Sequence, residues 1–204
     1  MMEWPLLSRI VNGLLWRVAW RTETLFVRAG PLAIDPPNPL GFELVRLGRE
    51  RTRGLEIAET AMVRAGEQPE LVRQRIEHGD DFFGWESNGS VACFLWVTYR
   101  NRVTSGVRML EADNRAFLFN GYTLPEFRGQ GLYPQLFLHV RRHLMLEQRT
   151  EVVGEVNVRN TSSRRGIEKA GLKEVGRCSS ITFFRRWEFA LSKEMLDDSV
   201  PRLF

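Results

Sequence analysis

The sequence has few of the residues that build metal sites and disulfides. Its 204 residues include two cysteines and three histidines. Cys93 and Cys178 lie far apart in a spacing that fits no metal motif, so we expect two buried thiols in a reducing compartment. His139 and His143 lie four residues apart, as zinc ligands can, but no His-Glu-x-x-His pattern accompanies them. The sequence therefore predicts no metal site.

Long apolar runs are also missing, and the first residues do not resemble a secretory leader. No apolar run reaches the roughly 20 residues that a membrane-spanning helix needs. Residues 1–15 lack a basic leader and a small-residue cleavage site, so we expect no signal peptide. These features predict a cytoplasmic protein.

Lysine is scarce among the basic residues. Only three of the 29 basic residues are lysines, and the formal net charge is +4. Arginine pairs at 141–142, 164–165 and 185–186 are scattered, with no long basic run and no aromatic-interleaved platform. We therefore expect no nucleic-acid partner. A solvated basic face would also suit a small anionic ligand.

What is present is enough apolar sequence, at 43% of the residues, for one domain with a substantial core. Periodicity and turn residues predict strands and helices that alternate along the chain. We expect strands at 41–47, 82–86, 91–99, 116–124, 151–158, 174–177 and 181–191, and helices at 52–65, 69–78, 136–147 and 160–170. This order predicts an α/β fold in which a mixed central sheet has helices on both faces.

Residues 1–30 differ from the rest of the chain. Their apolar residues recur at helical spacing with Arg9, Arg17 and Arg21 between them, which predicts an amphipathic basic helix. This helix either packs on the domain or on a second subunit of a homodimer, or lies on an anionic membrane surface. With the proline-rich linker at its end, the extension covers residues 1–39. The main domain then covers 40–192, and a tail covers 193–204.

The most informative segment follows the apolar run at 116–124. There Arg128-Gly129-Gln130-Gly131-Leu132-Tyr133 forms a glycine turn between a strand and a helix. Glycine lets the backbone approach a phosphate, and the first N–H groups of a helix have no partner within it. The segment lacks the Lys-Ser/Thr pair of a P-loop and the third glycine of a dinucleotide fingerprint. It therefore predicts an anion site of another kind.

A second segment, 160–172, has the end signals of a helix. Asn160 is a good N-cap and Gly171 a good C′ residue, while Lys169 favours the negative end of the helix. The strand predicted at 151–158 precedes it. Strand, glycine turn, helix, strand and capped helix therefore follow one another in order.

Together the two segments resemble the Gcn5-related N-acetyltransferase (GNAT) superfamily over roughly residues 41–191. Its acyl-CoA loop reads Arg/Gln-x-x-Gly-x-Gly/Ala, which Arg128 and Gly131 match and from which Tyr133 departs. Its later motif has an Asn that opens a helix and a small residue three positions on, here Asn160 and Ser163.

The resemblance implies a sheet whose two central strands splay apart to admit the pantetheine arm of CoA. It implies transfer of an acetyl group from acetyl-CoA to a primary amine of an unidentified small-molecule or peptide acceptor, by direct attack in a ternary complex. The residues that it implies for binding acetyl-CoA are Tyr122, Thr123, Leu124, Arg128, Gly129, Gln130, Gly131, Leu132, Tyr133, Asn160 and Ser163. A backbone N–H group in 122–125 would stabilise the thioester oxygen.

Catalytic residues follow less directly. Glu155 resembles the catalytic base on the Leu-Glu-Val strand of the ribosomal-protein alanine acetyltransferases, but it could equally face solvent or bridge an arginine. Many family members have a tyrosine as general acid where this chain has Ile167. Tyr133 or Tyr122 could replace it, Tyr133 could instead stack on the cofactor loop, and water could supply the proton.

Two other functions remain open. The bulky Tyr133 and the N-terminal amphipathic segment are compatible with transfer of a longer acyl chain. Ile167 is compatible with a CoA-binding or partner-binding module that has lost catalysis.

Overall fold

A computed structural model describes residues 19–29, 36, 38–48, 54–105, 107–183 and 187–195. The helix expected over residues 1–18 lies outside these ranges, as do residues 196–204 of the predicted tail. None of the described helices is long and apolar enough to cross a membrane.

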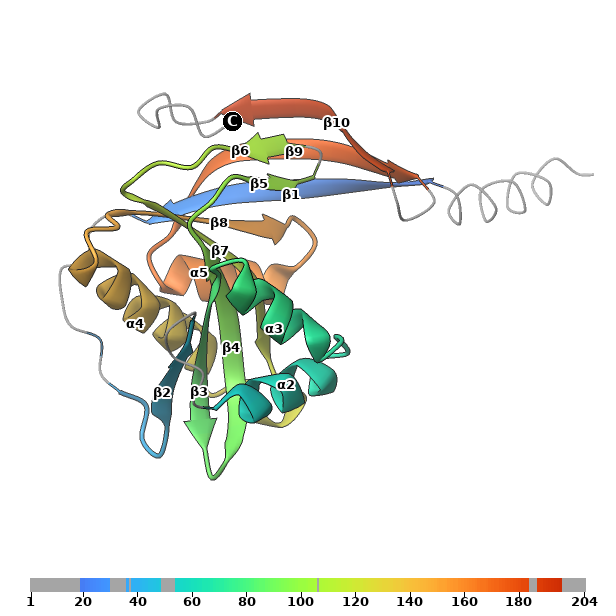
Figure 1. The fold of residues 1–204 in the computed structure, drawn as a ribbon. Helices are drawn as coiled ribbons and strands as arrows, with labels where there is room; N and C mark the ends of the chain where they lie inside the picture. Colours follow the sequence, from blue (N-terminus) through green and yellow to red (C-terminus); the bar gives the residue numbers. More distant parts are fainter. Residues whose placement is uncertain are drawn as a thin grey trace, which may run out of the picture.

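An eight-stranded mixed sheet forms the centre of the fold (Figure 1), in the order β10-β9-β1-β8-β7-β4-β3-β2. Its strands are β1 Ala19–Ala29, β2 Glu43–Leu47, β3 Asp81–Ser87, β4 Ser90–Thr98, β7 Arg115–Thr123, β8 Glu151–Asn157, β9 Lys173–Phe183 and β10 Trp187–Met195. The helices are α2 Leu55–Arg64, α3 Glu70–Glu77, α4 Leu132–Leu146 and α5 Thr161–Lys169. A separate hairpin pairs β5 Arg102–Thr104 with β6 Val107–Met109.

Most of the predicted elements are confirmed within a few residues. The predicted hairpin turns at Asn88 and Gly89, whose φ angles of 51° and 76° suit the left-handed region that this pair favours. The end signals of the predicted helix at 160–170 are also confirmed. Asn160 caps α5 by accepting a hydrogen bond from the Ser163 N–H, and Gly171 follows the helix with φ 78°.

The helix predicted over residues 1–30 is wrong for residues 19–29, which form β1. This strand lies between β8 and β9 and pairs antiparallel with both. The segment Trp20-Arg21-Thr22-Glu23-Thr24-Leu25-Phe26-Val27 is rich in aromatic and β-branched residues, which favour strands. The helix was predicted because the helical spacing of the preceding apolar residues was extended through this segment. Residues 19–29 therefore belong to the sheet.

Two further differences lie in the second half of the chain. The strands expected at 174–177 and 181–191 are instead β9, which is continuous from Lys173 to Phe183, and β10, which begins at Trp187. The β5–β6 hairpin was not predicted. It packs against the sheet, where Ser105 Oγ and Thr24 Oγ1 are 2.7 Å apart and Met109 joins a buried cluster with Phe26 and Val153.

The junction between β7 and β8 is the parallel part of the sheet. Its ladder starts at Arg115 and Glu151 and ends at Leu118 and Gly154, although both strands continue beyond it. On the other side of β7, the register with β4 shifts at Asn120, whose φ of 46° marks a β-bulge. Beyond Leu118 and Gly154, β7 and β8 therefore diverge, as the family resemblance implies.

The two faces of the sheet have separate cores. On one face, α4 and α5 pack on Leu118, Val152 and Val156. On the other face, α2 and α3 pack on Phe94, Trp96 and Phe119, and the β5–β6 hairpin covers Val153. Because side chains alternate along a strand, neighbouring residues of β7 and β8 contribute to opposite faces.

A buried ion pair closes the paired end of β7 and β8. Arg115 Nε lies 3.0 Å from Glu151 Oε2, and the two side chains are 4% and 7% exposed. Arg28 Nε lies 3.6 Å from the other carboxylate oxygen. Removing one partner of a buried pair leaves an uncompensated charge in a low dielectric.

We therefore expect Arg115→Ala to lower the free energy of unfolding by about 3 kcal/mol, the low end for a broken buried pair because Arg28 remains. Denaturant unfolding measures this change. The matched control is Arg73→Ala, which breaks an ion pair to Glu59 through a largely exposed arginine and should cost much less. Equal losses in the two variants would contradict a special role for the β7–β8 junction.

Candidate active site

The glycine turn joins β7 to α4 beside the divergent strands. Gly129 and Gly131 have φ angles of 81° and 74°, a left-handed conformation that favours glycine. Gly131 is the N-cap of α4 and provides no side-chain cap, and Pro134 has no N–H group. The N–H groups of Leu132 and Tyr133 therefore lie in the first helical turn, where an anion is favoured.

A cavity of about 600 Å³ lies between this turn and α5. Nine of the eleven residues predicted to bind acetyl-CoA line it, and the exceptions are Leu124 and Gln130. The cavity is also lined by Arg165 and Lys169, one helical turn apart on α5, and by Phe127. The i, i+4 spacing of the two basic residues was the signal that could have identified them from the sequence.

The backbone groups of Leu124 are already bonded within the protein. Its N–H donates to the Ala92 carbonyl at 2.9 Å, and its carbonyl accepts from the Phe127 N–H at 3.0 Å. Pro125 has no N–H. Since N–H groups alternate in direction along an antiparallel strand, that of Tyr122 faces β4 and that of Thr123 faces away from it. Of the donors expected in 122–125, Thr123 is the one directed towards the gap beside β7.

Tyr133 lies where the family prefers glycine or alanine, and two glycines make room for it. A methyl group on Gly121, beside the β-bulge, would lie 2.8 Å from Cζ of Tyr133, and one on Gly166 of α5 would lie 3.0 Å from its Cδ1. The ring also packs edge to face on Phe137, with centroids 4.8 Å apart. Tyr133 therefore spans from α4 to β7, whereas Ile167 is buried in the core.

Burial suppresses the ionisation of the Tyr133 phenol and the Cys93 thiol. Burial raises the pKa of the Tyr133 phenol well above its usual range, so the hydroxyl is neutral at physiological pH. Burial also raises the pKa of the Cys93 thiol to about 12, although a hydrogen bond from Thr123 partly offsets this effect. Cys93 and Cys178 are both buried free thiols, as predicted. Cys93 is therefore no thiolate nucleophile.

Glu155 lies on the opposite face of β8 from α4 and α5, because it shares the face of Val153. Arg102 of β5 donates a hydrogen bond from Nη2 to Oε1 of Glu155 at 3.2 Å. The other carboxylate oxygen is buried and accepts no hydrogen bond from the described part of the chain. Glu155 thus forms the bridge to an arginine that was one of the two alternatives to a catalytic base. Its second carboxylate oxygen can still accept a hydrogen bond.

Asn157, two residues after Glu155 on β8, is exposed and caps a turn by accepting a hydrogen bond from the Arg159 N–H at 2.9 Å. Arg102 is a functional candidate that the sequence analysis missed. The signal was weak, because Arg102 belongs to a strand of three residues whose position depends on the whole sheet.

The two histidines noted in the sequence have structural partners, and so does Asp81 of β3. Asp81 accepts hydrogen bonds from Nη2 of Arg46 at 2.6 Å and from the Tyr99 hydroxyl at 2.8 Å. The rings of His139 and His143 pack edge to face on Trp85 and Phe83 of β3. These contacts fasten α4 and β2 to the sheet.

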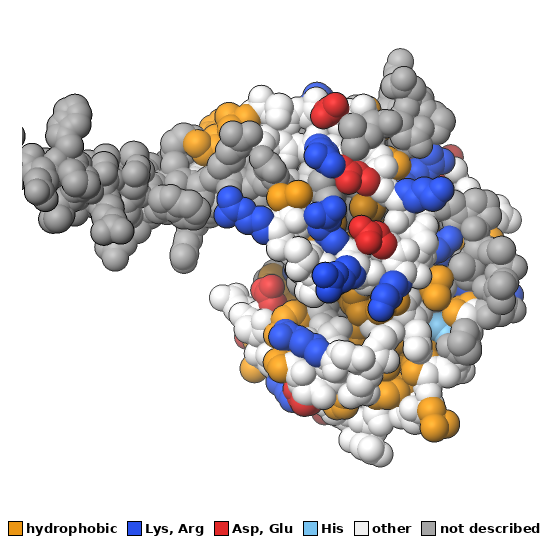
Figure 2. Space-filling model, turned by 180° about the vertical axis from the view of Figure 1, so that it is seen from behind, with side chains coloured by type: hydrophobic (Ala, Val, Ile, Leu, Met, Phe, Trp, Pro, Cys, Tyr) orange, Lys and Arg blue, Asp and Glu red, His pale blue; other side chains and the backbone are white. Residues whose placement is uncertain are grey.

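The surface carries both signs of charge. On the face seen from behind, Lys and Arg side chains lie across the middle with Asp and Glu side chains among them (Figure 2). This mixed pattern differs from a continuous basic stripe of the kind that tracks a nucleic-acid backbone.

No protein-family model and no curated protein sequence matches the chain. Solved structures do match it. An acetyltransferase assigned to the GNAT family from Novosphingobium aromaticivorans aligns with 85% of the chain at a TM-score of 0.56 and 20% identity. A GNAT-family acetyltransferase from Colwellia psychrerythraea aligns with 89% at 0.56 and 16% identity. A tandem GNAT protein from the clavulanic acid biosynthesis pathway aligns with 90% at 0.54 and 17% identity.

The chain has the GNAT fold. The alignments cover 66%, 61% and 59% of those three proteins, so the chain spans about two thirds or less of their length. At these identities the likeness concerns the fold alone. In this fold, β7 lines the cavity beside α4 after it separates from β8. Glu155 follows Gly154, the last residue of β8 in the parallel ladder.

We predict that Gly121→Ala destabilises the protein by about 1–3 kcal/mol, because the added methyl group overlaps the Tyr133 ring. Thermal and denaturant unfolding measure this cost. In a Tyr133→Ala background the ring is gone, so the same substitution should cost less than about 0.5 kcal/mol. If the two costs are equal, the methyl group is not clashing with Tyr133.

Proposed function

We propose that this protein is a CoA-dependent acyltransferase that moves an acetyl group from acetyl-CoA to a primary amine in a ternary complex. The observation that carries the proposal is the glycine turn at the start of α4, beside a pair of parallel strands that separate after Leu118 and Gly154. Such a turn favours a pyrophosphate, and the separated strands provide room for an extended chain between them.

The residues present fit acetyl-CoA as a substrate. The N–H groups at Gly129, Gly131, Leu132 and Tyr133 and the side chains of Arg128, Arg165 and Lys169 suit its phosphates. The Thr123 N–H, which is directed away from β4, suits the thioester oxygen. A preorganised donor of this kind is typically worth about 3–4 kcal/mol in the transition state.

The proposal assigns the donor and the acceptor to opposite faces of the sheet. Acetyl-CoA enters on the face of α4 and α5, and the amine approaches on the face of Glu155. Glu155 takes a proton from the amine through its free oxygen, directly or through water. The nitrogen attacks the thioester carbon, so that a C–N bond forms while the C–S bond breaks.

The proposal gives Tyr133 the role of hydrogen-bond donor to the leaving sulfur. Burial raises the pKa of its phenol above that of a thiol, so transfer of the phenolic proton to the thiolate is uphill. The thiolate therefore takes its proton from solvent, to which Glu155 returns the proton that it removed from the amine, while Tyr133 stabilises the developing charge. This assignment combines two options that the sequence left open, a role for Tyr133 at the leaving group and a proton supplied by water.

Binding of acetyl-CoA can be tested at Gly131. We expect Gly131→Asp to abolish binding measured by calorimetry, because it puts a negative charge beside the phosphates. Gly131→Asn is the matched control, since Asn tolerates the left-handed conformation and adds a similar volume without charge. It should retain a larger part of the affinity. Unchanged affinity in a folded Gly131→Asp protein would refute binding at this turn.

The base can be tested at Glu155. We expect Glu155→Gln to lower kcat by on the order of 10²–10⁴ and to leave the affinity for CoA nearly intact. Glu168→Gln, on the exposed surface of α5, is the control and should leave kcat unchanged. A loss below about threefold at neutral pH would show that Glu155 only anchors Arg102. The absence of any turnover in the native protein would favour a CoA-binding module without catalysis.

A further inference from the structure

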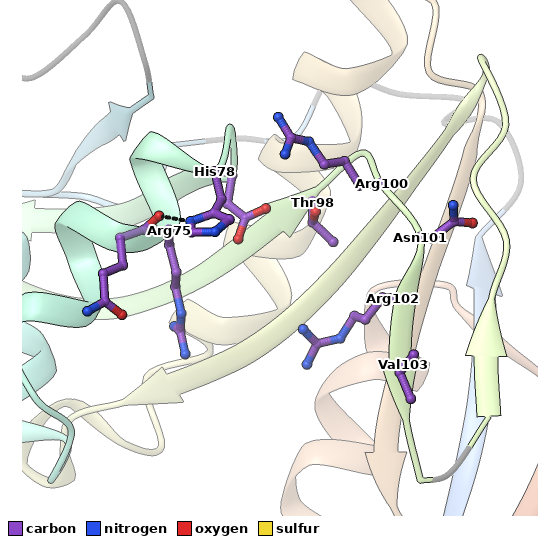
Figure 3. Close-up of a pocket in the computed structure, with 9 residues that line it drawn as sticks. Arg75, His78, Thr98, Arg100, Asn101, Arg102 and Val103 are labelled. Atoms are coloured by element: carbon purple, nitrogen blue, oxygen red, sulfur yellow. Dashed lines mark hydrogen bonds between the residues drawn. The ribbon is translucent and has the colours of Figure 1, made fainter.

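A second cavity lies on the face of the sheet that carries Glu155. It has a volume of about 370 Å³, within the range of about 300–1,000 Å³ that is usual for small-molecule sites. Its walls come from the end of α3, the end of β4 and the start of β5 (Figure 3). Three arginines line it, Arg75, Arg100 and Arg102.

Two of these guanidinium groups are held against the same aromatic ring. The guanidinium carbon of Arg75 lies 5.2 Å from the ring centroid of Phe119, and that of Arg102 lies 4.1 Å from it. Figure 3 shows Arg75 extending from α3 and Arg102 reaching towards it from β5. Burial and the nearby charge of Arg102 both lower the pKa of Arg75. The two cations therefore repel each other across the cavity.

The protein supplies little negative charge to balance them. Within the described residues, neither Arg75 nor Arg100 forms an ion pair, and Arg102 forms one, to Glu155. The side-chain oxygen of Asn120 can accept from both terminal nitrogens of Arg75, at 2.8 and 3.2 Å, but it carries no charge. Asp80 is the acidic residue in the lining. Burial raises the pKa of its carboxyl group, although a hydrogen bond from Thr98 and the arginines partly offset this.

The cavity also borders the reacting region. Asn120, which holds Arg75, is the bulge residue of β7 and precedes Gly121, over which the Tyr133 hydroxyl lies. Arg102 contacts both the cavity and the Glu155 carboxylate. An anion between Arg75 and Arg102 would therefore lie one side chain away from the candidate base.

We propose that this cavity binds an anionic oxygen group of the acceptor, so that the substrate is an amine that also carries a carboxylate or a phosphate. The inference rests on the proposed function, because it names the class of acceptor. The anion shares Arg102 with Glu155 and neutralises the excess positive charge. The amine of the same molecule is then directed to the free oxygen of Glu155.

The test compares matched amines in the native protein. One pair is O-phosphoethanolamine and ethanolamine, and the other is β-alanine and propylamine. We expect kcat/KM to be at least tenfold higher for the anionic member of one pair. The pair that shows this preference identifies whether the cavity binds a phosphate or a carboxylate. Arg75→Gln and Arg100→Gln should abolish the preference, and Arg75→Lys should restore part of it. Arg73→Gln, on the same helix but outside the cavity, should retain it.

A readout without catalysis separates this inference from the proposed function. Inorganic phosphate should raise the melting temperature of the protein, both without CoA and at saturating CoA. Arg75→Gln and Arg100→Gln should remove that shift, whereas Arg73→Gln, outside the cavity, should not. If acetyl-CoA neither binds nor reacts, the proposed function fails, and the phosphate shift still tests the cavity. Equal kcat/KM values within both pairs, or a phosphate shift that survives both cavity variants, would overturn the inference.

Discussion

The short parallel ladder between β7 and β8 is the constraint on which the rest of the structure depends. It holds the two halves of the sheet together from Arg115 and Glu151 to Leu118 and Gly154 and then ends. A buried ion pair joins the two strands at its first rung, and both strands continue beyond its last rung, where they diverge. If the ladder slipped by one residue, Glu155 would move to the other face of the sheet.

Two chemical environments result from this divergence. On the face of α4 and α5, backbone N–H groups and a neutral tyrosine surround a cavity with basic residues at its rim. On the other face, a carboxylate is held by an arginine that belongs to a cluster of three. Under the proposed function, the two substrates would therefore approach one point from opposite sides without competing for the same groups.

The parts of the structure that could be predicted from the sequence are those encoded locally. The glycine turn, the Asn160 cap and the Asn88–Gly89 hairpin depend on the conformations that a few adjacent residues can adopt. In contrast, β1 owes its place to β8 and β9, and Arg102 meets Glu155 because the β5–β6 hairpin packs on the sheet. Two glycines far apart in sequence accommodate Tyr133, which no local pattern reveals.

The interior position of β1 in the sheet also affects how the chain folds during synthesis. Leu25 pairs with Val156, which is 131 positions later, and on its other side with Arg177. At roughly 5–20 residues per second, the ribosome needs on the order of ten seconds to make both partners after β1 emerges. Until then the strand exposes unpaired N–H and C=O groups on two edges, a form that aggregates readily. Of the described strands, β1 is synthesised first but is therefore among the last to pair with both of its neighbours.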